Sequence, residues 1–165
     1  MKTIPIDKLV DVIILYCNSN GLTITPLKLQ KILYYIQAWH IARFEKHTLF
    51  DELPEAWVNG PVYRSVYNTF SEKFYRNTPL KINVQGDVPE ELETQMNELD
   101  LDQLQTEHIN TTIKFYSPQS EGNLVLKTHA DAPWNIARDG LDAFERSSNE
   151  ISIDSMFDYY NPLLA

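Results

Sequence analysis

The pair His129 and Asp131 offers the chain's best prospect of catalysis. The two side chains stand two residues apart, and with a further carboxylate nearby in space they would bind a metal or perform acid/base chemistry. The same stretch also has a structural interpretation, in which Thr128 or Asp131 caps the following turn, Pro133 begins a helix and Trp134 fills the core beside His129. We favour the structural interpretation and keep a hydrolytic enzyme that uses His129 and Asp131 as an alternative.

The remaining reactive side chains show no catalytic or metal-binding spacing. His40, His47 and His108 belong to no HExxH, HxxxH or Cys-His pattern. Cys17 is the single cysteine and falls on an apolar stripe, so we expect an inert packed thiol. The chain has no glycine-rich phosphate loop and no nucleophile-elbow motif. We therefore expect a non-enzymatic protein without a cofactor or a metal site.

The charge of the chain argues against nucleic acid as a partner. The formal net charge is −9, whereas duplex binding depends on Lys and Arg that displace counterions from phosphates. Residues 82–113 contain eight acidic residues and no Lys or Arg. This acidic segment is either a solvated helix face or a docking face for a basic partner. The first residues lack the apolar run of a signal peptide and no stretch is long enough to span a bilayer, so we expect a cytoplasmic protein with no membrane partner.

Apolar spacing predicts helices around the possible sites. A stripe over residues 6–20 predicts a first helix, and Thr25 followed by Pro26 is typical of an N-cap and first turn. The second helix should run to about His47. Because it is apolar on most faces, we expect it to lie at the centre of the fold.

The segment Glu55–Tyr63 predicts a turn. Trp57 favours a short strand, and Gly60 and Pro61 break it, so we expect Pro61 to open a third helix that runs to about Phe74. If the second and third helices pack side by side, some of their basic side chains form either a solvated face or a patch for an acidic partner: Lys28, Lys31, Arg64, Lys73 and Arg76.

The rest of the chain predicts shorter elements. Residues 77–88 are expected to be extended or loop, with residues 81–84 alternating like a short strand. Further helices are predicted from Pro89 to about Glu98, over residues 101–115, from Pro133, and over residues 153–160. The chain is therefore expected to be mainly α, a single compact helical domain of about six helices with a small β element, covering residues 1–165.

Three ordered blocks in the sequence resemble the Panacea domain, a family of antitoxins and phage-associated proteins that includes SocA-like proteolytic adaptors. The blocks are Thr25–Trp39, Glu55–Phe70 and Thr128–Arg138. The resemblance implies a mainly helical antitoxin of a toxin-antitoxin system, acting by protein–protein interaction. We therefore expect this chain to bind a cognate protein toxin encoded beside it or, as an adaptor, to deliver the toxin to a AAA+ protease. The motif residues that the resemblance makes candidates for partner binding are Lys28, Gln30, Lys31, Trp39, Trp57, Gly60, Pro61, Tyr63, Tyr67, Thr128, His129, Pro133 and Trp134.

Overall fold

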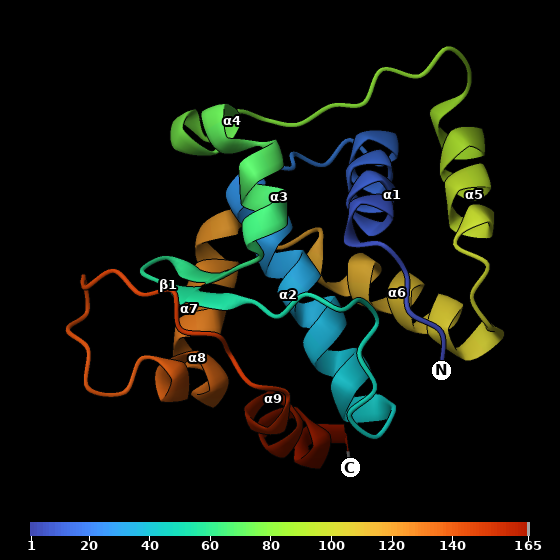
Figure 1. Cartoon of the computed structure of the whole chain (residues 1–165). Coiled ribbons are helices and arrows are strands. Elements are labelled where there is room, and N and C mark those ends of the chain that lie inside the picture. Colours follow the sequence, from blue (N-terminus) through green and yellow to red (C-terminus); the bar gives the residue numbers. More distant parts are fainter. Residues whose placement is uncertain (165) are drawn as a thin grey trace.

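Helix α2 (Pro26–Arg43) runs through the middle of the fold, as its apolar sequence predicts (Figure 1). In this computed structural model, which describes residues 1–164, α2 packs against α1, α6, α7, α9 and β2. Thr25 caps the helix by accepting a hydrogen bond from the backbone N–H of Lys28 at 3.2 Å. The helix ends at Arg43, earlier than predicted, because the chain turns through positive φ at Glu45 and Lys46.

The acidic segment forms an outer layer beside the first helix. Helix α5 (Val88–Glu98) packs against α1 (Ile6–Ser19) and contains no fully buried residue. Leu92 and Met96 face the core, while Glu90, Glu93 and Glu98 are exposed. The acidic side chains therefore face solvent, as both interpretations of this segment require, and the choice between a solvated face and a docking face stays a prediction.

The remaining helices surround α2. They are α3 (Arg64–Thr69), α4 (Ser71–Arg76), α6 (Gln103–Tyr116), α7 (Glu121–Ala130), α8 (Ala132–Ala137), α9 (Ile153–Tyr160) and a 3-10 helix over Asn161–Leu164. Within residues 1–164 the chain forms nine α-helices and one two-stranded sheet, so the mainly helical fold with a small β element is confirmed. The helices outnumber the expected six in part because the predicted third helix is divided into α3 and α4.

The sheet is an antiparallel hairpin of β1 (Glu55–Trp57) and β2 (Gly60–Val62), and it corrects the prediction for Pro61. Pro61 lies in β2 opposite Ala56 and does not open a helix; α3 begins at Arg64. The backbone N–H of Ala56 donates outward to Asn149 O at 2.8 Å. The middle pair of the ladder therefore needs no N–H from proline, which is why a proline is tolerated in this strand.

The stretch 81–84 forms an extended loop and not the short strand that its alternation indicates. Its neighbour Leu80 donates its N–H to Ile24 O at 2.7 Å, and Ile82 donates to the side-chain oxygen of Asn18 at 3.1 Å. Asn18 also donates to Leu80 O at 3.2 Å, so the loop is held by two hydrogen bonds to α1 and one to the chain before α2. None of the helices between residues 1 and 164 combines the length and the apolar composition needed to cross a bilayer.

Candidate functional site

The three sequence blocks meet where the hairpin crosses α2. Lys31 from α2 is completely buried, and its Nζ donates to Pro61 O at 2.9 Å. Gly60 has φ +109°, and a Cβ at this position would lie 2.8 Å from Thr128 Oγ1 and 2.9 Å from Lys31 Nζ. Only glycine fits this conformation and this close approach without displacing its neighbours. Residues far apart in the sequence therefore lock the hairpin onto α2 and α7.

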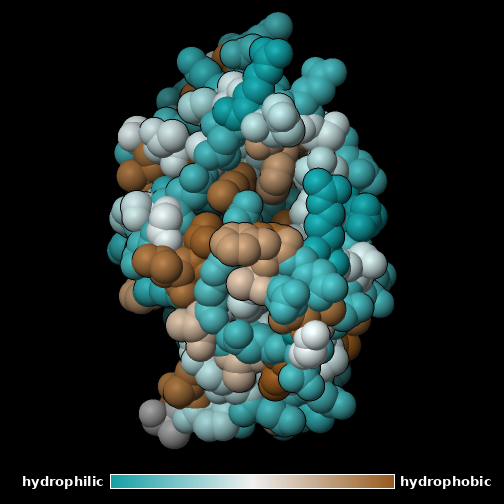
Figure 2. Space-filling view, turned by 90° about the vertical axis from the view of Figure 1, so that its left-hand side faces the viewer, coloured by the Kyte–Doolittle hydropathy of each residue, from teal (hydrophilic) through white to brown (hydrophobic). Residues whose placement is uncertain are grey.

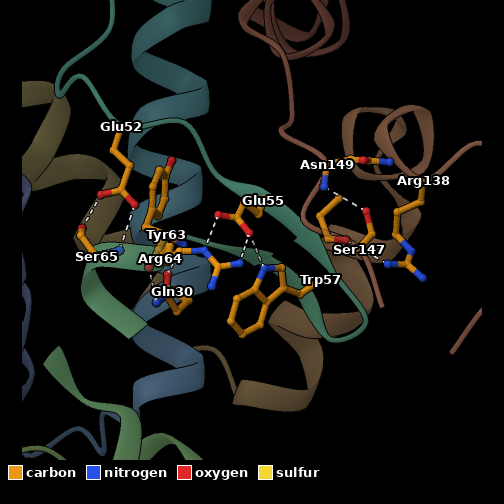
Figure 3. A network of polar contacts seen from close by, with 11 residues as sticks. Gln30, Glu52, Glu55, Trp57, Tyr63, Arg64, Ser65, Arg138, Ser147 and Asn149 are labelled. Atoms are coloured by element: carbon orange, nitrogen blue, oxygen red, sulfur yellow. Dashed lines mark hydrogen bonds and ion pairs between the residues drawn. The ribbon is translucent and has the colours of Figure 1, made fainter. Parts of the chain in front are cut away.

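Gln30 holds the hairpin at the point where β2 ends. Its Oε1 accepts from Tyr63 N at 2.8 Å, and its Nε2 donates to Tyr63 O at 3.1 Å (Figure 3). The Gln30 amide thus makes with the backbone of Tyr63 the two hydrogen bonds that a neighbouring strand would otherwise make. The Tyr63 ring is buried edge-on against Phe50 at 5.2 Å, and burial raises the pKa of its hydroxyl well above its usual value.

Two of the five basic residues grouped from the sequence, Lys28 and Lys31, are inside the protein, whereas Arg64, Lys73 and Arg76 are exposed. Lys31 has no carboxylate within ion-pair distance among residues 1–164, and burial lowers its pKa to about 7. Lys28 is buried as well and donates from Nζ to Ser117 O at 2.6 Å; burial also lowers its pKa. The central position of α2 leaves no solvent-facing side for these lysines, so their amino groups bind backbone carbonyls.

The carboxylate of Asp131 accepts hydrogen bonds from three tyrosine hydroxyls. It accepts hydrogen bonds from Tyr35 at 3.0 Å, Tyr159 at 3.1 Å and Tyr160 at 2.6 Å. Its carboxylate therefore ties the end of α7 to α2 and α9. The sequence interpretation in which the Asp131 side chain caps the following turn is wrong, because the carboxylate makes no capping hydrogen bond to α8 and accepts from the three tyrosines instead.

His129 lies against aromatic and backbone groups. Its ring stacks on Trp134 with 4.2 Å between centroids. Burial lowers its pKa, with the positive charge of Lys31 adding to the effect, and its Nε2 is buried with no hydrogen-bond partner in residues 1–164. In the same range no group of three or more His, Cys, Asp or Glu side chains is placed to hold a metal ion. The imidazole is thus packed beside Trp134, in surroundings that favour its neutral form.

Trp134 and Pro133 pack inside the protein next to the hairpin, whereas Trp39 lies away from it. Trp134 donates from its indole to Trp57 O at 2.8 Å, and Pro133 is buried in the first turn of α8. Trp39 lies in the last two turns of α2, where its indole donates to Tyr116 OH at 2.8 Å and its ring packs against Tyr160. It does not join the hairpin site.

Arg138 is a functional candidate that sequence reasoning did not single out. It is buried, and it donates to Ala56 O at 2.9 Å, to Glu145 O at 2.6 Å and to Asp142 O at 3.1 Å. It therefore fastens the loop of residues 139–149 to the hairpin. The signal available in the sequence was its place at the end of the third block, but only the fold shows that a buried guanidinium spans three carbonyls.

A cleft opens beside the hairpin, and we call it the hairpin cleft. It has a volume of about 640 Å³ and lies between the hairpin, α3–α4 and the loop of residues 139–149. Figure 2 shows this face, with hydrophobic side chains gathered around its middle and hydrophilic ones around them. The lining residues are Trp57, Val58, Asn59, Val62, Arg64, Tyr67, Phe74, Arg146, Ser147 and Ser148.

Aromatic rings form one wall of the hairpin cleft. Trp57 and Tyr67 pack edge-to-face at 4.9 Å, and Tyr67 and Phe74 do so at 5.0 Å. Glu55 holds the first ring in place, because its carboxylate accepts from the Trp57 indole at 3.0 Å and from Arg64 at 2.7 and 2.9 Å (Figure 3). The hydrogen bond from Arg64 lowers the pKa of Glu55, which keeps the carboxylate ionised. Of the motif residues, only Trp57 and Tyr67 line this cleft.

The hairpin thus has two distinct sides. On one side are the buried contacts of Gln30, Lys31, Gly60, Thr128 and Trp134, which we call the lock, and on the other is the open hairpin cleft. No curated protein and no solved structure matches the chain. A family model does match, over residues 29–135, and this range covers more than half of the chain and includes the lock residues from Gln30 to Trp134. The chain belongs to the family of the antitoxin SocA-like, Panacea domain.

Proposed function

We propose that this protein is a non-enzymatic antitoxin that binds and neutralises a protein toxin encoded beside it. Membership of the SocA-like antitoxin family supports an antitoxin-type role with a protein partner. The observation that carries the proposal is that the motif residues around the hairpin have two different environments. Buried contacts inside the protein are made by Gln30, Lys31 and Thr128. The hairpin cleft, in contrast, is lined by Trp57 and Tyr67, which remain accessible to a partner.

The proposed mechanism is occlusion of the toxin's active surface. A stable protein complex buries roughly 800 Å² on each partner, and aromatic and arginine side chains supply most of the binding energy at such interfaces. The hairpin cleft presents Trp57, Tyr67, Phe74 and two arginines together, which is the composition expected of an interface centre. It would be extended by the neighbouring surface of α3 and α4.

Co-expression tests this function. Each gene adjacent to that of the antitoxin is induced alone and together with it, and growth is measured. We expect one neighbour to arrest growth, the antitoxin to restore it, and the two purified proteins to form a stable one-to-one complex by light scattering. If no neighbour arrests growth and the tagged protein is recovered from its host alone, the proposal is wrong.

The same growth experiment in a host strain that lacks the AAA+ protease distinguishes occlusion of the toxin from its delivery to the protease. Occlusion restores growth equally in hosts with and without the protease, and the amount of toxin stays constant. An adaptor would restore growth only where the protease is present, and the toxin would disappear from the cells.

A further inference from the structure

The lining of the hairpin cleft has the opposite charge to the chain as a whole. The protein carries a formal net charge of −9, yet the lining contains Arg64 and Arg146 and neither Asp nor Glu. Lys73 and Arg76 flank Phe74 on α4 and are exposed. Glu55, just outside the lining, pairs with Arg64 at 2.7 Å, so the excess positive charge of the cleft comes from Arg146 and the neighbouring Lys73 and Arg76. Such a site favours carboxylates over amines by charge complementarity.

Both arginines retain hydrogen-bonding capacity. Within residues 1–164 Arg146 makes no ion pair and no side-chain hydrogen bond, and it is exposed. Arg64 lies over the Trp57 ring at 5.3 Å and uses Nε and Nη2 on Glu55, which leaves Nη1 without a partner in that range. A guanidinium that stacks on an indole and is held by a carboxylate is already oriented, so it loses little side-chain freedom on binding.

The loop that carries Arg146 is held in place. Arg138 binds the carbonyl of Glu145, the residue before Arg146, at 2.6 Å. On the other side of Arg146, the backbone N–H of Asn149 donates to Ser147 Oγ at 3.0 Å (Figure 3). The buried guanidinium of Arg138 therefore sets the position of the exposed one.

We propose that the hairpin cleft binds an acidic segment of the toxin, with Asp or Glu carboxylates pairing with Arg64 and Arg146 and an apolar side chain packing on Trp57 and Tyr67. This inference rests on the proposed function, because it names the surface and the partner chemistry that the antitoxin uses. Carboxylate pairing supplies orientation and association rate, and the apolar contact with the aromatic wall supplies affinity.

The three tryptophans provide the readout. Trp57 lines the cleft, Trp39 is outside the lining and bonds to Tyr116, and Trp134 is buried. In ¹⁵N-labelled protein each indole N–H gives a separate NMR signal, and Trp57→Phe identifies the one from the cleft. The probes are the purified toxin and a short synthetic peptide with a leucine between aspartates, together with the same peptide carrying lysines in place of the aspartates.

We expect the toxin and the acidic peptide to shift the Trp57 signal while the Trp39 signal stays in place, and the lysine peptide to leave both unchanged. Arg146→Glu should weaken binding of the toxin about tenfold or more. The matched control is Arg43→Glu, the same charge reversal at an exposed arginine at the end of α2, and it should bind as the wild type does.

The outcomes keep the inference and the proposed function apart. A toxin complex that leaves the Trp57 signal unmoved, or that tolerates Arg146→Glu as well as Arg43→Glu, overturns the inference and leaves the antitoxin function standing. If no neighbouring protein binds but the acidic peptide shifts Trp57 in an Arg146-dependent way, the cleft chemistry stands and the antitoxin function fails. Equal shifts by the acidic and the lysine peptide overturn the charge argument.

Discussion

Gly60→Ala tests whether the lock between the hairpin and α2 stabilises the fold as the geometry indicates. The added Cβ would lie 2.8 Å from Thr128 Oγ1 and 2.9 Å from Lys31 Cε and Nζ. Overpacking of this kind costs roughly 1–3 kcal/mol. The positive φ of +109° adds about 1–3 kcal/mol for a residue that has a Cβ. We therefore expect a loss of roughly 2–6 kcal/mol, a large part of the 5–15 kcal/mol of a typical domain.

Urea denaturation followed by circular dichroism measures this loss, and Gly21→Ala is its matched control. Gly21 also has positive φ, at +66°, but a Cβ there meets nothing within 4 Å. The control should lose only the conformational part, about 1–2 kcal/mol. Adding Thr128→Ala to Gly60→Ala removes the closest atom and should recover part of the stability. If Gly60→Ala costs no more than Gly21→Ala, the close approach of the hairpin is not what stabilises this region.

Three further variants test the other buried polar groups. Because burial lowers the pKa of Lys31 from 10.5 to about 7, the unfolded chain binds more protons than the folded one between these values. The free energy of unfolding should therefore rise with pH by up to about 1.4 kcal/mol per pH unit over this range. Lys31→Met should remove this contribution, as measured by urea titrations at several pH values. An unchanged slope in the variant would contradict the lowered pKa of Lys31. Asp131→Asn should lower the free energy of unfolding by about 2–4 kcal/mol, because three tyrosine hydroxyls lose the carboxylate that accepts from them. The control Asp154→Asn, at an exposed ion pair, should lower the free energy of unfolding and the melting temperature far less. Equal losses for the two variants would refute the structural role of Asp131. Arg138→Lys should free the loop of residues 139–149, seen as faster hydrogen exchange there with protection of α2 retained, and unchanged exchange would show that the loop is held by other contacts.

Local patterns in the sequence determined most of the helices. The apolar stripe of α1, the Thr25 cap and the proline at the start of α2, and the stripe of α9 depend on residues within a few turns of one another. The continuous apolar character of α2 also predicts its central position, because a helix without a polar face must be covered on all sides. The three blocks, taken in order, were enough to indicate the family that the match over residues 29–135 shows.

Tertiary contacts decided what those blocks do. Pro61 follows a glycine and precedes an aromatic stripe, which locally suits the start of a helix as well as a strand, and Gln30 settles the choice by bonding to Tyr63 from another element. Lys31 is a polar residue that any local rule places at the surface, yet the hairpin and α7 close over it.

The hairpin cleft depends on the tertiary structure alone. Arg64 and Arg146 are separated by about half of the chain, and they come together because Arg138 binds the loop to the hairpin. Spacing along a sequence reports which side chains share one helix face or one strand face. It carries no information about a helix and a distant loop that only the tertiary structure brings together, so the sequence predicted the scaffold and the fold determined the surface.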